Sequence, residues 1–329
     1  MMNTEIYETE LLRNIRNTLS KFRDINEYRA DTIYHYTSPS GLLGILKDGK
    51  VNLWFTQYDS LNDRNERLDI TRSLADYCQE KANQKIISDN VLSTITQIKP
   101  TSSIVISREP IVPVLPQSDP NLTTYNELID ADCYAYLCCF SKNSDSLAMW
   151  NYYTKSRHYE GYSIGVSPWH LSHSQYKNSD YKLSVHDVIY TRDDKYRLFE
   201  EYFLPLLIAC DSASDEQKVS ILFAVQKAVN NLQFIFKDEH FQHENEVRAI
   251  LLVPKTFTQN NVLSERKYRE SNGYIIPYVE YTLAGYDLRE IITAPLFEQE
   301  LAQNNLQSML TQRGYTNVNI KPSMIPIRF

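Results

Sequence analysis

Residues 34–49 read YHYTSPSGLLGILKDG, and this stretch predicts how the core of the fold begins. A short strand is expected over 32–37. Ser38-Pro39-Ser40 then offers a helix N-cap with proline in the first turn. Gly49 stands where a helix commonly ends in a left-handed glycine. A second strand, VNLWFT at 51–56, completes a strand–helix–strand opening.

Beyond residue 56, extended and helical spacing alternate irregularly, which favours an α+β fold in one domain over 1–329. We expect a helical lead-in at 1–28, the first half of the core at 29–193, a helical insertion at 194–240 and the second half of the core at 241–329. The proline-rich stretch 100–120 predicts an extended surface loop. Helices are expected at 8–25, 64–86, 194–209, 215–236 and 296–313, and further strands at 133–140, 162–166, 182–190, 246–253, 274–281, 289–293 and 316–320.

Glycine is scarce, with 8 residues in 329. Rossmann and phosphate-loop enzymes need clustered glycines where the backbone turns against a pyrophosphate. Residues 44–50, GILKDGK, satisfy the spacing GxxxxGK. However, Val51 follows the lysine and the expected helix precedes Gly49, which is the wrong setting for a phosphate loop. Any bound nucleotide is therefore expected to be held mainly by side chains.

The formal net charge of −7 argues against non-specific adhesion to nucleic acid. Five cysteines without a CxxC pair suit reduced thiols, and no apolar run is long enough to cross a membrane. We expect a cytoplasmic protein without a membrane partner. His240, His243 and Glu244 lie close in sequence but match no zinc motif, so no metal is expected, and a metal-dependent hydrolase is kept as a second alternative.

Three distant segments carry the chemistry-bearing side chains. In the strand 32–37, alternation places His35 on one face and the neighbouring tyrosines on the other. The strand at 51–56 offers large aromatic faces. Glu244 and Glu246 stand two apart at the start of the strand 246–253. Burying a carboxylate there raises the free energy of the folded state, so we expect it either to form an ion pair or to have a functional role. An ion pair with Arg248 is the structural alternative for Glu246, and a satisfied core histidine is the alternative for His35.

The sequence resembles a bacterial family, domain of unknown function 2971, through short motifs that appear in a shared order from Tyr34 to Arg328. They are YHYTS with GLLGIL, LWFT followed by LND, CFS-x3-DSLAMW-x2-Y, GYSIGV, E-x-EVR and S-x-IPIR. The family name implies no activity.

The opening YHYTS, the helix, the second strand and the late glutamate-led strand also resemble the layout of ADP-ribosyltransferase-type NAD-binding folds. That resemblance implies a split, mixed or antiparallel sheet with an N-terminal helix and an inserted helical hairpin. It also implies that His35 and Glu246 match the family's histidine and glutamate, with Glu244 completing an E-x-E pair. The residues assigned to catalysis are Glu246, His35 and Glu244, and those assigned to binding NAD are His35, Tyr36, Thr37, Trp54, Tyr58, Asn62, Asp63, Trp150, Tyr153 and Arg248.

The resemblance implies an enzyme that consumes NAD as a substrate and passes ADP-ribose to an unknown macromolecular acceptor or to water, as a toxin or antiphage effector. Cleavage of the nicotinamide–ribose bond develops oxocarbenium character, which a glutamate near the ribose stabilises. An aromatic face can stack on nicotinamide. The first alternative is a non-enzymatic module that binds a nucleotide or a protein through an aromatic surface at Trp150 and Tyr153.

Overall fold

The computed structural model describes residues 32–61, 66–108, 127–153, 160–172, 181–256, 263–271, 273–295 and 298–326. The helix expected at 8–25, the residues Asn62 and Asp63, and Arg328 of the terminal motif lie outside these ranges.

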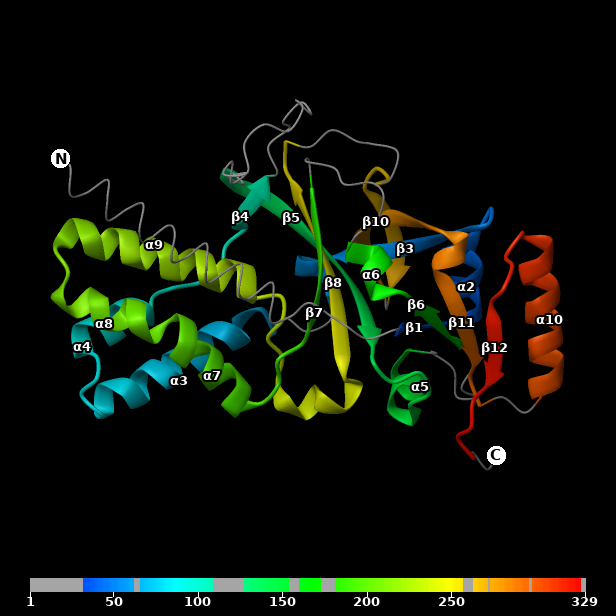
Figure 1. Ribbon diagram of the computed structural model, residues 1–329, viewed down its shortest axis with the longest axis horizontal. Coiled ribbons are helices and arrows are strands. Elements are labelled where there is room, and N and C mark those ends of the chain that lie inside the picture. The colour runs from blue at the N-terminus through cyan, green and yellow to red at the C-terminus, as the bar shows by residue number, and fades with distance from the viewer. Residues whose placement is uncertain are drawn as a thin grey trace, which may run out of the picture.

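Within the described residues, twelve strands form one sheet (Figure 1). The strands are β1 (Ile33–Thr37), β2 (Leu46–Lys47), β3 (Lys50–Gln57), β4 (Ser103–Arg108), β5 (Glu127–Ser141), β6 (Tyr162–Val166), β7 (Lys182–Asp187), β8 (Glu246–Pro254), β9 (Lys267–Ser271), β10 (Tyr274–Ala284), β11 (Leu288–Thr293) and β12 (Asn319–Pro322). The main path runs β12-β11-β6-β1-β5-β3-β10-β9, with β8 joining β5 to β7. Pairing is antiparallel except between β11 and β12.

Most helices stand at the two ends of the molecule in Figure 1, while one lies below the sheet and one lies near its middle. They are α2 (Pro39–Ile45), α3 (Asp69–Asn83), α4 (Asp89–Ile95), α5 (Leu147–Tyr153), α6 (Pro168–Ser172), α7 (Arg192–Tyr202), α8 (Leu204–Ser212), α9 (Asp215–Leu232) and α10 (Gln299–Gln312). Single 3-10 turns are η1 (Tyr58–Ser60), η2 (Glu66–Leu68), η3 (Glu239–Glu244) and η4 (Gly285–Asp287). No helix in the described part of the chain is both long enough and apolar enough to span a bilayer.

The predicted strand–helix–strand opening is confirmed. The Ser38 side chain accepts from the Gly41 N–H, and Pro39 occupies the first turn of α2. Gly49 has φ +66°, the left-handed conformation that favours glycine. Leu42 and Ile45 face the core, which fixes α2 against the sheet.

The sheet divides at β5. β8 pairs along one edge of β5, from Cys133 to Ser141. On the opposite edge β1 pairs at Ser141, whereas β3 pairs at Tyr136 and Leu137. Cys139 lies between these two attachments, where β1 and β3 separate. We call this place the split.

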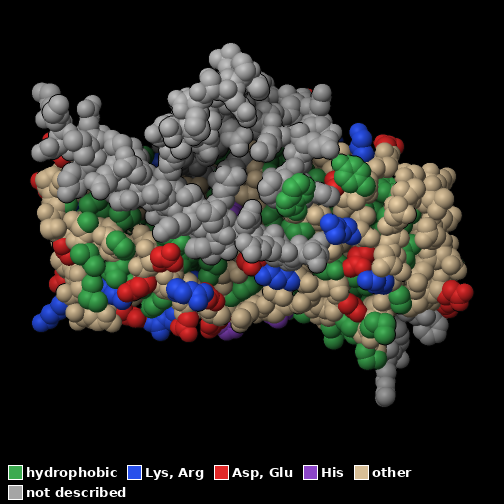
Figure 2. Space-filling view, in the orientation of Figure 1, with side chains coloured by type: hydrophobic (Ala, Val, Ile, Leu, Met, Phe, Trp, Pro, Cys, Tyr) green, Lys and Arg blue, Asp and Glu red, His purple; other side chains and the backbone are tan. Residues whose placement is uncertain are grey.

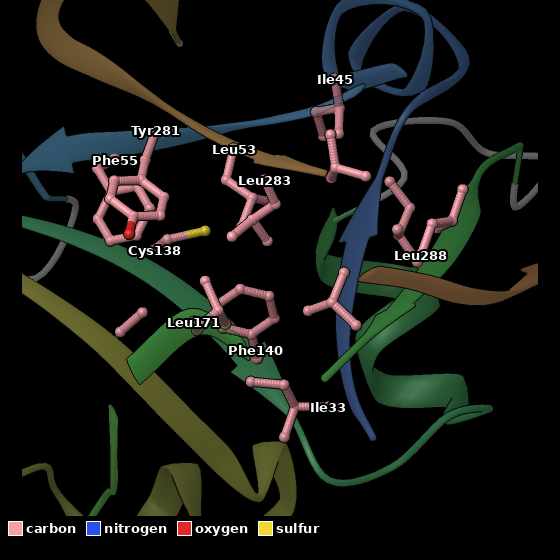
Figure 3. Close-up of a cluster of buried hydrophobic side chains, with 14 of the residues drawn as sticks. Ile33, Ile45, Leu53, Phe55, Cys138, Phe140, Leu171, Tyr281, Leu283 and Leu288 are labelled. Atoms are coloured by element: carbon pink, nitrogen blue, oxygen red, sulfur yellow. The ribbon is translucent and has the colours of Figure 1, made fainter. Parts of the chain in front are cut away.

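Two faces of the sheet pack against different helices. One face carries the core shown in Figure 3, where Ile33, Phe55, Cys138 and Phe140 meet apolar side chains from α2, α6 and α10. The opposite face carries Leu137, Ile250 and Leu252, which pack against the helical group α3, α4, α7, α8 and α9. A smaller cluster on that second face joins Tyr36 to Trp150 of α5.

The broad α+β assignment is confirmed as a mixed fold with a large, mostly antiparallel sheet. The expectation of a surface loop from residue 100 is wrong over Ser103–Arg108, which forms β4 and pairs with β5. Its centre is rich in β-branched residues, which favour strands, and the prolines lie on either side of it. The helical insertion contains three helices, because the segment expected as one helix over 194–209 divides before Leu204-Pro205.

Candidate functional site

His35 lies at the split and is tied to the backbone of Cys139. Its Nδ1 is 2.9 Å from the Cys139 carbonyl oxygen, which can only accept, so Nδ1 carries the proton. Burial lowers the pKa of His35, the Cys139 carbonyl opposes that shift, and the positive charge of Arg269 adds to it. The ring is therefore neutral at pH 7, and Nε2 is its hydrogen-bond acceptor.

Glu246 reaches the same residue from the other face of the sheet. Glu246 pairs with Ser141 across β8 and β5, and Tyr34 pairs with Ser141 across β1 and β5, so these three share a face. Alternation along β1 places His35 on the opposite face. The Cys139 thiol points toward Glu246 and hydrogen-bonds with its carboxylate. His35 and Glu246 thus meet at Cys139 without lying on one surface.

Glu246 belongs to a buried ionic cluster, which we define as Glu66, Lys237, Glu244, Glu246 and Arg248. The Glu246 carboxylate accepts from Arg248 Nε at 2.9 Å and Arg248 Nη2 at 3.0 Å. Lys237 Nζ donates to Glu246 at 3.0 Å and to Glu244 at 2.6 Å. Arg248 also pairs with Glu66 and donates to the Phe234 carbonyl at 2.7 Å. The ion pair considered for Glu246 in the sequence is observed.

The charges in the cluster are nearly balanced. Burial alone would raise the pKa of Glu246, but Arg248 and Lys237 outweigh it and lower the pKa to about 2. Burial raises the pKa of Glu66, against the pull of Arg248. Protonation of Glu66 would leave two carboxylates opposite two cations. Breaking a buried ion pair typically costs about 3–5 kcal/mol, so the cluster joins β8 firmly to η2 and η3.

Tyrosines surround the cluster. Tyr190 accepts from the Glu246 backbone N–H at 2.9 Å, and Tyr58 donates to the Gln233 carbonyl at 2.8 Å. Tyr153, from α5, is 37% exposed, yet burial of its hydroxyl and the nearby Glu244 and Glu246 carboxylates raise its pKa well above the usual value. Tyr153 therefore extends from the protein surface to the edge of the cluster.

The remaining aromatic and hydroxyl residues assigned from the sequence have structural contacts. Tyr36 donates to the Asn143 carbonyl at 2.8 Å and packs edge-on against Trp150, with ring centroids 4.6 Å apart. Trp150 is fully buried and donates to Asp145 at 2.7 Å, so the aromatic surface expected at Trp150 and Tyr153 cannot include Trp150. Thr37 is buried close to Gly41 of α2.

Arg269 and Trp54 form a second polar arrangement beside the split. Arg269 Nη2 donates to the Thr56 hydroxyl at 2.9 Å, and its guanidinium carbon lies 5.7 Å from the Trp54 ring centroid. Arg269 Nε and Trp54 Nε1 are both shielded from solvent and have no hydrogen-bond partner among the described residues. An unmade hydrogen bond of this kind costs about 1–3 kcal/mol per donor.

The residues weighed for a metal do not converge. His240 Nδ1 contacts Asp238 at 2.6 Å on the exposed surface, whereas the Glu244 side chain is buried against Lys237. The His243 ring lies 5.6 Å from that of Tyr152. Among the described residues, no three His, Cys, Asp or Glu side chains are grouped so as to hold a metal ion.

Residues 149–249 match the model of a family described as "Protein of unknown function (DUF2971)". The matched region contains Lys237, Glu244, Glu246 and Arg248, but neither His35 nor Trp54. The comparisons with curated proteins and with solved structures gave no match.

Sequence reasoning missed three members of these two sites. Glu66 lies far from β8 in sequence, and Lys237 lies nine residues before Glu246 and outside that strand, so only the fold brings them to Arg248 and Glu246. Arg269 was missed because a single arginine in a polar stretch normally lies in solvent. The alternation in Lys267–Ser271, which places Arg269 between two neighbours on the opposite face, was the available signal.

Proposed function

We propose that this protein binds NAD at the split and consumes it, passing ADP-ribose to an acceptor or to water in the manner of ADP-ribosyltransferase-type enzymes. The observation that supports this proposal is that His35 and Glu246 both contact Cys139, each from its own face of the sheet, where β1 and β3 separate. These are the two residues that the resemblance pairs in catalysis. A split sheet is also what that resemblance implies.

The protonation states suit distinct roles. With its pKa near 2, Glu246 is ionised at neutral pH and is a poor proton acceptor, so its role is electrostatic stabilisation of developing positive charge. Neutral His35 presents Nε2 as an acceptor for a ribose hydroxyl or for the N–H of a carboxamide. The ion pairs of Glu246 also give it a structural role, and the experiment must separate the two.

The test measures nicotinamide release from NAD by the whole chain. We expect His35→Gln and Glu246→Gln to lower the rate about 100-fold or more, a loss typical of removing one electrostatic stabiliser. Glu66→Gln is the matched control, because it removes another carboxylate from Arg248 without touching Cys139. Circular dichroism and thermal unfolding establish that each variant folds.

Two results would contradict the proposal. One is a wild-type protein that neither binds NAD nor releases nicotinamide. The other is a folded Glu246→Gln variant whose rate equals that of Glu66→Gln, because the carboxylate would then serve only the fold.

A further inference from the structure

We propose that Arg269, Trp54 and Thr56 form an anion subsite that binds a phosphate group of a nucleotide. This inference rests on the proposed function only in placing that nucleotide at the split. The residues come from β9 and β3, and none of them belongs to the ionic cluster.

The donors of this subsite are unmatched by acceptors. Arg269 makes a single described hydrogen bond, to the Thr56 hydroxyl, and its Nε has none. The Trp54 indole N–H on the adjoining side chain is likewise unsatisfied. Two shielded donors on touching side chains, with no acceptor in the described chain, indicate a place where an external acceptor binds.

The charge of Arg269 is also uncompensated. No carboxylate among the described residues pairs with it, whereas the buried Lys195 contacts one and the buried Lys237 contacts two. Burial lowers the pKa of Arg269, and among the described residues Cys138 and Tyr278 oppose this shift. Both have raised pKa values and are neutral at pH 7. Within the part of the chain that the structure describes, this half-buried cation therefore faces neutral groups and has no counter-ion.

A phosphate fits this donor set. Guanidinium groups bind phosphate through two N–H groups, and the indole N–H and the Thr56 hydroxyl can supply further donors from the side of β3. The subsite also adjoins the split, because Thr56 pairs with Leu137, the last β3–β5 pair before the strands separate. Arg269 is close enough to His35 to lower its pKa.

The experiment is calorimetric titration of the whole chain with ADP-ribose and, separately, with inorganic pyrophosphate. We expect both to bind, and Arg269→Gln to weaken binding of both about tenfold or more, as for loss of a charge-assisted contact. Arg266→Gln is the matched control, since it loses the same charge three residues away, where Arg266 donates to Tyr136. It should change binding less than about twofold. Arg269→Lys should fall between wild type and Arg269→Gln.

Several outcomes would overturn the subsite. These are a wild-type protein that binds neither probe, equal weakening by Arg269→Gln and Arg266→Gln, or wild-type affinity in a folded Arg269→Gln variant. Binding of ADP-ribose but not pyrophosphate, with no effect of Arg269→Gln, would place recognition on the nucleoside and also count against it.

The outcome is distinguishable from that of the proposed function. Arg269-dependent binding of ADP-ribose without nicotinamide release would establish the subsite and refute NAD consumption. Nicotinamide release with Arg269→Gln binding as tightly as wild type would do the reverse.

Discussion

Arg248 is buried and Arg269 is half-buried, and their surroundings are opposite. Every side of Arg248 meets an acceptor, with Glu246, Glu66 and the Phe234 carbonyl around one guanidinium. Arg269 meets one hydroxyl and an aromatic face. The first arrangement is complete without a ligand, and the second is not.

The partners of a buried charge indicate whether it serves the fold or a ligand. A cation whose partners all come from the chain contributes to holding the fold, and its removal leaves carboxylates buried and unpaired. A cation without such partners raises the free energy of the folded state until something binds. Surface charge gives no comparable indication, since Figure 2 shows lysine, arginine, aspartate and glutamate intermixed over the face it presents.

Replacing each arginine by methionine should give the largest difference between the two sites. Arg248→Met removes the described cation partner of Glu66 and leaves Glu246 with Lys237 alone, and we expect a loss of about 3–5 kcal/mol in the free energy of unfolding. Arg269→Met leaves no unpaired carboxylate among the residues that the structure describes, so we expect a change within about 1 kcal/mol of zero. Urea unfolding measures both.

Equal destabilisation by the two substitutions would show that Arg269 has a partner as strong as that of Arg248. If Arg248→Met does not unfold cooperatively, Glu66→Gln provides a milder measure of the same cluster.

Lowering the pH should destabilise the ionic cluster around Arg248 but not the site around Arg269. The pKa of Glu246 is about 2 in the folded chain against an ordinary value of 4.5, so its contribution is fully present above pH 4.5. It is lost as the pH falls from 4.5 toward 2, and a shift of this size corresponds to roughly 3 kcal/mol. Between pH 4.5 and 2, the free energy of unfolding should fall more steeply with pH in wild type than in Glu246→Gln. Arg269→Met should leave the wild-type slope unchanged. A wild-type slope equal to that of Glu246→Gln would contradict the low pKa.

Gly44 of α2 lies against Trp54, so a substitution there can displace the Trp54 indole without changing the ionic cluster. A Cβ on Gly44 would lie 2.7 Å from Trp54 Cζ2, well inside normal contact. Gly44→Ala should therefore displace the indole and cost about 1–3 kcal/mol, despite the better helix propensity of alanine. The Gly44→Ala substitution should weaken ADP-ribose binding. It should leave unchanged the pH dependence of stability that Glu246 produces between pH 4.5 and 2. Leu43→Ala, at an exposed position of the same helix, is the control. Unchanged stability in Gly44→Ala would mean that Trp54 is not packed there.

The smallest expected effect concerns His35. Its pKa is lowered by burial, so the stability it contributes is present above the ordinary value of 6.5 and is lost as the pH falls below it. His240 should act in the opposite direction, because Asp238 raises its pKa. We compare the loss of unfolding free energy when the pH is lowered from 7 to 5. This loss should be smaller than that of wild type in His35→Gln and larger than that of wild type in His240→Gln. The same slope in His35→Gln as in wild type would contradict a buried neutral ring.

The local rules predicted much of the first core. Strand β1, the Ser38 cap and Gly49 were all recognisable, because each depends on neighbours within a few residues. The site was predicted less completely. Arg248 as a partner of Glu246 followed from spacing along one strand, but Glu66 depends on how η2 approaches β8, and Lys237 depends on the path of the chain between α9 and η3. Trp150 was placed on a surface because its burial depends on Tyr36, more than one hundred residues away.

The split also has a mechanical consequence. β5 joins two groups of strands, one that continues from β1 and one that continues from β3, and each group pairs with β5 at only one or two residues. β5 itself is held by its long ladder to β8. Rotating one group of strands against the other would break few backbone hydrogen bonds, so the attachments at Ser141 and Leu137 are natural hinges. Amide exchange should be faster at these two fastenings than along the β5–β8 ladder.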